Sequence, residues 1–170
     1  MKRYIQNPVF LFILWMAVAL VCSLMLIPKE TYSNYITFSQ AFWHTISSLP
    51  LYIYYPEEQR DLFLYGISFT TLISPFALLP RQVGMVLWCL ANCGFLYWAI
   101  KKLDLKKWQF AVIILISVND VFTSVLSQQY SIGITAMIIF SYVLIEKEKD
   151  FWAALMIVFG TMTKLYGIVG

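Results

Sequence analysis

Four charged side chains stand directly before a long apolar segment in the first half of this sequence. They are Glu57, Glu58, Arg60 and Asp61. They follow an aromatic stretch, and the chain then runs without a break into an apolar segment ending in Pro-Phe-Ala-Leu-Leu-Pro at Pro80. A soluble protein rarely places such charges against so much apolar sequence. The pattern favours a membrane enzyme at the water–lipid boundary, whose substrate has a polar head and an oily tail.

Two more ionisable side chains lie inside apolar segments that are long enough to cross a membrane. At ~1.5 Å of helix per residue, Asp120 lies roughly 18 Å and Lys164 roughly 20 Å from the inner surface. Charged groups at such depths are costly and are functional candidates by default. Two interpretations stay open. Asp120 and Lys164 form a structural ion pair, or Lys164 faces an anionic lipid headgroup while Asp120 orients it or holds a metal ion.

Other polar residues carry weaker signals. The turn 128–131, which includes Gln129, is expected to open on the same face as Asp120 and Lys164. His44 is the only histidine, and on an aromatic surface helix we expect an interfacial residue rather than a catalyst. The sequence contains no phosphate loop, no G-x-G-x-x-G after a strand, no serine nucleophile elbow and no Cys/His spacing typical of metal ligands.

The composition is that of an integral membrane protein. Of the 170 residues, 61% are hydrophobic and 12% are charged, whereas soluble domains carry about 25% charged residues. The net charge of +3 indicates no nucleic-acid partner, because the basic residues form short tracts beside apolar segments. Cys22, Cys89 and Cys93 lie in apolar runs and are expected to be buried as small apolar packing residues.

The positions of the apolar segments predict an all-α, polytopic helix bundle with about five membrane spans. A crossing needs about 20 mostly apolar residues. The expected spans lie near residues 9–27, 83–100, 108–126, 131–145 and 151–168. The first of these is too long for the roughly 7–15 apolar residues of a signal peptide, so we expect a retained helix.

The segment 62–79 is long enough to span but is interrupted by Gly66, Pro75 and Pro80. Cytoplasmic loops collect Lys and Arg. An N-terminus inside the cell, with 62–79 kept as an interfacial or re-entrant helix, places the tracts at 2–3, 101–107 and 147–149 in the cytoplasm. The loop 28–61 then faces outward, and its apolar residues Ile36, Phe38, Phe42, Trp43 and Ile46 predict a short amphipathic surface helix.

Three blocks of the sequence together resemble glycosyltransferase family 87, membrane enzymes of the GT-C class. The first runs from Leu51-Tyr52-Ile53-Tyr54-Tyr55-Pro56-Glu57-Glu58 through Asp61-Leu62-Phe63-Leu64-Tyr65 to the Pro-Phe-Ala-Leu-Leu-Pro motif. The second is Gly84-Met85-Val86-Leu87-Trp88-Cys89-Leu90-Ala91-Asn92. The third begins at Glu146-Lys147-Glu148-Lys149 and ends in Lys164-Leu165-Tyr166-Gly167. The resemblance implies the N-terminal part of a GT-C-type transmembrane module.

The resemblance also implies a reaction. Such enzymes take a hexose from a polyprenyl-phosphate carrier on the outer face of the bacterial cytoplasmic membrane and pass it, with inversion, to a glycolipid or glycan. A carboxylate of the first outer loop acts as base, and a cation stabilises the departing lipid phosphate. On this sequence the resemblance assigns the base to Asp61 or Glu57, and after them to Glu58. It assigns binding of the donor phosphate to Lys164 and Gln129.

The sequence departs from the family pattern at two places. Asn34 stands where many relatives carry an Asp, and an amide cannot serve as a base. Tyr65-Gly66-Ile67 replaces the usual Tyr-Ser-Pro, which changes the turn that shapes the loop. Tyr65, Asn34 and Asp120 are therefore expected in supporting roles. No metal site is assigned, although a divalent metal cofactor stays open.

Enzymes of this class are roughly twice this length, so the chain is expected to be incomplete at its C-terminus. Two alternatives to an enzyme stay open. One is a truncated, non-catalytic membrane protein or an accessory subunit that binds a carrier lipid. The other, which draws on Asp120 and Lys164 alone, is a small transporter or channel.

Overall fold

The computed structural model describes residues 6–169 and, in that part of the chain, contains helices and turns but no strand. The elements are α2 (Pro8–Leu26), α3 (Ser33–Ile46), α4 (Ser68–Ala77), α5 (Arg81–Lys102), α6 (Lys107–Leu126), α7 (Ser131–Ile145), α8 (Asp150–Thr163) and the 3-10 helix η1 (Leu165–Val169). The all-α helix bundle predicted from the sequence is confirmed. Lys2 and Arg3, which entered the charge argument, lie outside the described residues.

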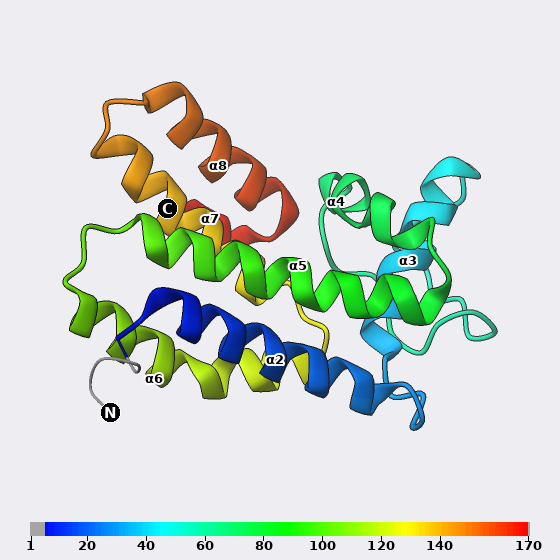
Figure 1. Ribbon diagram of the computed structural model, residues 1–170. Helices are drawn as coiled ribbons and strands as arrows, with labels where there is room; N and C mark the ends of the chain where they lie inside the picture. Colours follow the sequence, from blue (N-terminus) through cyan, green and yellow to red (C-terminus); the bar gives the residue numbers. More distant parts are fainter. Residues whose placement is uncertain (1–5, 170) are drawn as a thin grey trace.

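Five of the helices run back and forth between two ends of the molecule (Figure 1). α3, α4 and residues 47–67 lie at one end, called the loop end below. Residues 101–107 and 146–149 lie at the other, called the lysine end. α2 packs against both α5 and α6, and α7 packs against both α5 and α8. This arrangement brings the turn after α6 and the end of α8 to the loop end, together with the acidic loop.

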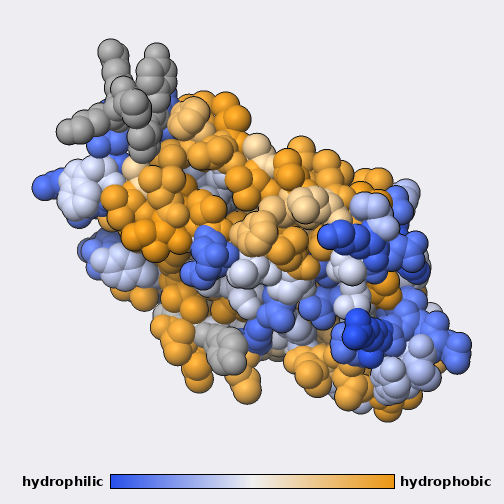
Figure 2. All heavy atoms as spheres, turned by 90° about the horizontal axis from the view of Figure 1, so that it is seen from below, coloured by the Kyte–Doolittle hydropathy of each residue, from blue (hydrophilic) through white to orange (hydrophobic). Residues whose placement is uncertain are grey.

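The bundle carries the surface expected of a membrane protein. α2, α5 and α6, with 19, 22 and 20 residues, are long and apolar enough to cross a membrane. α7 and α8 are apolar but shorter, with 15 and 14 residues, so the count of five spans stays a prediction. Figure 2 shows hydrophobic residues over the middle of one face and hydrophilic residues gathered at the loop end.

Local signals explain where the first long helix begins and how it is held. The Asn7 side-chain oxygen accepts hydrogen bonds from the backbone N–H groups of Val9 and Phe10 at 2.9 and 3.4 Å, and Pro8 occupies the first turn. The indole N–H of Trp15 donates to the backbone oxygen of Cys93 at 3.0 Å. This bond joins α2 to α5 inside the bundle.

The segment 62–79 forms a short helix rather than a long one. α4 covers only ten residues, about 15 Å at the rise of an α-helix, which is half the thickness of a bilayer core. Gly66 precedes it in non-helical chain, and Pro75 and Pro80 lie at its C-terminal end. α4 packs against α3 and α5, so this segment caps the loop end of the bundle.

The last helix is shorter than the expected span 151–168. α8 ends at Thr163, Lys164 adopts an extended backbone, and η1 packs back against α7 and α8. Gly167 permits this return, because a Cβ built on it would lie 2.1 Å from the carbonyl carbon of Gly160. The chain therefore turns at Lys164 and leaves that residue at the loop end.

The surface helix predicted in the outer loop exists as α3, and one side of it is buried against the rest of the protein. The buried residues are Tyr35, Thr37, Phe38, Ala41 and His44. Of the apolar positions expected to lie on the membrane, Phe38 is buried in the protein, whereas Ile46 is 60% and Trp43 is 43% exposed. Small side chains at positions 37 and 41 let α3 pack closely. Hydrophobicity alone did not distinguish a lipid-facing side from a protein-facing one.

Candidate functional site at the loop end

The three predicted carboxylates all lie in the loop between α3 and α4. Glu57, Glu58 and Asp61 are exposed. The backbone of this stretch is fixed in part by α3, because the hydroxyl of Thr37 donates to the carbonyl oxygen of Asp61 at 3.4 Å. The loop thus presents carboxylates to solvent from a backbone tied to a helix.

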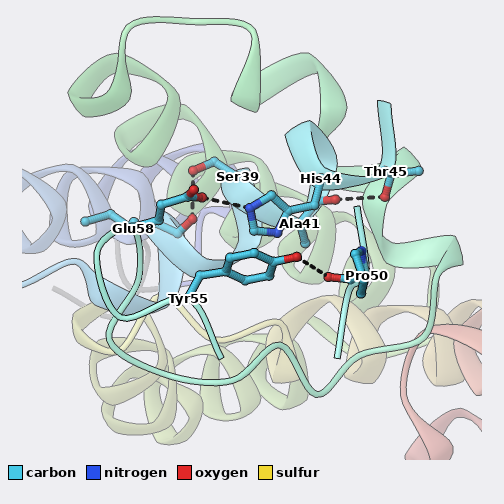
Figure 3. A network of polar contacts seen from close by, with 8 residues as sticks. Ser39, Ala41, His44, Thr45, Pro50, Tyr55 and Glu58 are labelled. Carbon is cyan, nitrogen blue, oxygen red and sulfur yellow. Dashed lines mark hydrogen bonds and ion pairs between the residues drawn. The ribbon is translucent and has the colours of Figure 1, made fainter. Parts of the chain in front are cut away.

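Glu58 is held by a histidine that the sequence analysis expected only at the interface. Nε2 of His44 lies 2.7 Å from Oε2 of Glu58, and the His44 side chain is 4% exposed while that of Glu58 is 42% exposed. Figure 3 shows Glu58 and Tyr55 both beside the His44 ring, with the Tyr55 ring centroid 4.1 Å away. This burial of His44 beside a carboxylate was not anticipated from the sequence.

The signal that would have found this contact is the spacing of α3. Thr37, Ala41 and His44 fall on one helix face at intervals of four and three residues, and all three are buried. A histidine on the buried face of a surface helix needs a polar partner. The acidic loop that follows supplies that partner, in Glu58.

Gln59, the residue after Glu58, is a second candidate site residue that the sequence analysis did not identify. Gln59 is 4% exposed, and neither its amide nitrogen nor its amide oxygen has a hydrogen-bond partner among the described residues. Leaving a buried polar group unsatisfied costs about 1–3 kcal/mol. A ligand hydroxyl that reached this amide would remove that cost, and the amide lies next in the chain to a carboxylate fixed by His44.

The loop and the end of α8 are joined at one junction. The backbone N–H of Gly66 donates to the carbonyl oxygen of Thr163 at 3.0 Å, and the hydroxyls of Ser68 and Thr163 lie 3.3 Å apart. A Cβ built on Gly66 would lie 1.7 Å from the carbonyl oxygen of Met162. Only glycine permits so close an approach at this position.

This junction brings Lys164 onto the face of Tyr65. The ammonium nitrogen lies 5.2 Å from the centroid of the Tyr65 ring, within the ~6 Å range of a cation–π contact. Tyr65 belongs to an aromatic cluster with Phe38 and Phe69, at centroid distances of 5.0 and 4.6 Å. Burial raises the pKa of Tyr65, and a hydrogen bond with the backbone of Tyr130 opposes this rise. The phenol therefore stays protonated at neutral pH.

The turn 127–130 is held against the same cluster. The amide of Asn34 donates to the backbone oxygen of Ser127 at 2.7 Å, and the indole N–H of Trp88 donates to that of Gln128 at 3.2 Å. Tyr130 stacks on Trp88 at 5.3 Å. Gln129, predicted to bind phosphate, is exposed at the tip, where its side-chain oxygen accepts from Ser131 at 3.5 Å. Asn34 thus positions the turn that carries Gln129.

Asp120 lies apart from these residues. It is exposed on α6, and the structure shows no ion pair between Asp120 and Lys164, both of which are described. The backbone oxygen of Asp120 accepts a hydrogen bond from Thr123 at 3.0 Å. The structural ion pair considered from the sequence is absent.

A polar hollow lies between α3 and the α4–α5 turn. Its cavity volume is about 410 Å³, within the range of about 300–1,000 Å³ typical of ligand sites. Side chains of several polar kinds line it: Tyr35, Ser39, Gln40, Trp43 and Arg81. Burial raises the pKa of Tyr35 to about 12, and its hydroxyl donates to the carbonyl oxygen of Phe76 at 2.8 Å. The hollow combines an indole face with an amide and a guanidinium.

No group of three or more His, Cys, Asp or Glu side chains within residues 6–169 has the arrangement of a metal site. The acidic residues of the loop are spread along its surface instead. The chemistry that these residues themselves offer is proton transfer by a carboxylate and charge stabilisation by an ammonium.

Comparison with known protein families gives a match over the second part of the chain. The model of glycosyltransferase family 87 matches residues 63–170. This range contains Tyr65, Asp120, Gln129 and Lys164, whereas Asn34 and the three loop carboxylates lie before it. No curated protein and no solved structure matches the chain. Because the matched residues make up more than half of the sequence, the chain belongs to glycosyltransferase family 87.

Proposed function

We propose that this membrane protein transfers a hexosyl group from a polyprenyl-phosphate-linked sugar to a glycolipid or glycan acceptor at its loop end, with inversion at the anomeric carbon. The observation that carries this proposal is the junction of the acidic loop with the end of α8. Through the bond between Gly66 and Thr163, the segment that follows the three carboxylates meets Lys164. A base and a cation at one end of an apolar bundle suit a lipid-linked donor.

The reaction divides between these two kinds of side chain. A loop carboxylate takes the proton from the acceptor hydroxyl while that oxygen attacks the anomeric carbon. The bond from the anomeric carbon to the phosphate oxygen breaks, and the polyprenyl phosphate leaves with the bonding electrons. Lys164 stabilises the charge that develops on this phosphate. Exposed Leu165 and Ile168 follow Lys164 in η1 and offer an apolar surface to the prenyl chain.

Among the three carboxylates, we assign the base first to Glu58. Its carboxylate is oriented by His44 at 2.7 Å and still keeps an exposed side chain, so it can meet an acceptor. The unpaired amide of Gln59 is its neighbour in the chain. For Glu57 and Asp61 the described residues show no side-chain hydrogen bond or ion pair. They remain candidates, although the motif alone ranked them higher.

The polar hollow is assigned to the acceptor. Sugars present an apolar face of C–H bonds and an edge of hydroxyls, so a site that combines an aromatic ring with planar polar groups matches them. Trp43 supplies the ring, and Gln40 and Arg81 supply the polar groups. Both His44 and Trp43 lie on α3, so one helix would position the base and the acceptor.

The test measures transfer of labelled hexose from a polyprenyl-phosphate hexose by the intact protein in membranes. Single amide variants E57Q, E58Q and D61N remove each carboxylate without changing its size. We expect the variant that removes the base to lose about 10²–10⁴-fold of turnover, with E58Q the most affected. D104N, at the lysine end, is the matched control. Full turnover in all three loop variants would exclude a loop carboxylate as base.

A further inference from the structure

We propose that a groove at the lysine end, between α5, α7 and α8, binds an anionic phospholipid. The phosphate of its headgroup lies among three lysines, and an acyl chain follows the apolar part of the groove. This site is at the opposite end of the bundle from the carboxylates and Lys164. The inference therefore stands whether or not the proposed transfer reaction is correct.

The groove has the size and the two-part lining that a phospholipid requires. Its cavity volume is about 360 Å³, within the range of about 300–1,000 Å³ typical of ligand sites. The charged residues that line it are all basic: Lys102, Lys147 and Lys149. The rest of the lining is apolar or aromatic.

The order of residues along two helices matches the order of groups in a phospholipid. In α5, Lys102 is followed toward the membrane interior by Trp98 and then Phe95. In α8, Lys149 at the start is followed by Trp152 and then Met156. Both series have spacings of three or four residues, so each lies on one helix face. Phosphate, the interfacial glycerol region and acyl chain follow one another in the same order, and Trp favours that interface.

The wall of the groove is built from rings in contact with one another. The Trp98 ring lies 4.7 Å from that of Phe140, and Phe95 stacks on Phe140 at 5.3 Å. Lys102 lies over the Trp98 ring at 5.6 Å, which holds its ammonium at the mouth. A site so arranged exists before a lipid arrives.

Charge selects the kind of lipid. Glu146 and Glu148 in the α7–α8 turn, and Asp150 at the start of α8, do not line the groove. The lining itself thus carries three positive charges and no negative one. Basic pockets between transmembrane helices bind anionic headgroups. An acyl chain against Phe140 and Met156 favours a phospholipid over a soluble phosphate.

The test is native mass spectrometry of the intact protein in detergent, with phosphatidylglycerol and phosphatidylcholine of identical acyl chains. The groove variant K102Q/K147Q/K149Q is compared with K101Q/K106Q/K107Q, which removes the same charge at the same end. We expect the native protein to retain more phosphatidylglycerol than phosphatidylcholine. A single lysine near an anionic lipid contributes roughly fivefold to binding, so the groove variant should lose at least tenfold and the control at most about twofold. V143W, which fills the groove and keeps all lysines, should lose retention as well.

Four kinds of result would overturn the inference. Equal retention of the two lipids, or equal losses in the two triple variants, would show general attraction to the surface. Retention undiminished in V143W would place the lipid elsewhere. Competition by glycerol phosphate as effective as by the lipid would show a headgroup site without an acyl-chain groove. A dimer that persists after delipidation and excludes the lipid would show that a second copy covers this face.

Discussion

Nε2 of His44 lies 2.7 Å from Oε2 of Glu58, and this contact joins the buried face of α3 to an exposed acidic loop. The histidine is buried and the carboxylate is half exposed. A pair of this kind orients the carboxylate from behind while the other side of the group stays open to a substrate. In the proposed reaction, His44 is a positioning residue and Glu58 is the group that would touch the acceptor.

Replacement of His44 separates positioning from packing. H44F keeps a ring in the site but cannot donate to Glu58, whereas H44Q keeps an amide donor. A hydrogen bond to a charged group contributes about 1.5–3 kcal/mol, so H44F should lower kcat by about 10- to 100-fold with little change in the KM for either substrate. H44Q should keep most of the activity. A higher KM with unchanged kcat in H44F would contradict this role. Steady-state transfer kinetics measure kcat and KM separately and so distinguish these outcomes.

The junction between Gly66 and α8 predicts a large effect of one methyl group. In G66A the new Cβ would lie 1.7 Å from the carbonyl oxygen of Met162, so the loop must move away from Lys164. Overpacking of this kind costs about 1–3 kcal/mol, which lowers Tm by roughly 2–12 °C. G94A is the control, because no atom lies within 4 Å of its Cβ. Thermal unfolding in detergent measures both, and equal Tm values would contradict the junction.

Tyr65 should support donor binding through its ring face and not through its hydroxyl. Y65F keeps the contact with Lys164 at 5.2 Å, and Y65L removes it. Loss of a cation–π contact of about 0.5–2 kcal/mol should raise the donor KM by roughly 2- to 30-fold in Y65L and leave Y65F near the native value. Burial raises the pKa of Tyr65 above its ordinary value of 10. Because the neutral phenol is then favoured, the ratio of KM values should not change from pH 6 to pH 9.

Variants in the polar hollow should weaken binding of the acceptor but not of the donor. W43A removes the ring and R81Q removes the cation, and both side chains line the hollow without contacting the junction at Lys164. We expect each variant to raise the acceptor KM by about tenfold with an unchanged donor KM. W108A, an exposed tryptophan at the lysine end, is the control. Equal increases for donor and acceptor would assign the hollow to another role.

The helices could be predicted from the sequence because apolar runs of this length have few alternatives. α2, α5 and α6 begin or end within about two residues of the expected spans 9–27, 83–100 and 108–126. The return of the chain at Lys164 could not be predicted in this way. It depends on the approach of Gly167 to Gly160, a contact between backbones that hydropathy does not record.

The site was predicted only in part, for a similar reason. The position of Lys164 at the same end of the bundle as the acidic loop follows from the order and direction of the apolar segments. The pairing of His44 with Glu58 depends on the side of α3 that is buried. That side carries small residues such as Ala41 beside the apolar Phe38, whereas the equally apolar Ile46 is 60% exposed. Lipid accepts apolar side chains as readily as a protein core does, so a membrane removes the usual signal for burial.

Orientation in the membrane decides whether the carboxylates and Lys164 work on the outer face, and cysteine labelling can test it. Cys22, Cys89 and Cys93 are buried, so an impermeant maleimide should leave the native chain largely unlabelled. Cysteine is introduced by Y54C at the loop end and by K147C at the lysine end, where both native side chains are exposed. Lysine-rich loops favour the cytoplasm, so intact cells should label Y54C and should label K147C only after permeabilisation. The opposite pattern would place the acidic loop in the cytoplasm, where a donor displayed on the outer face cannot reach it.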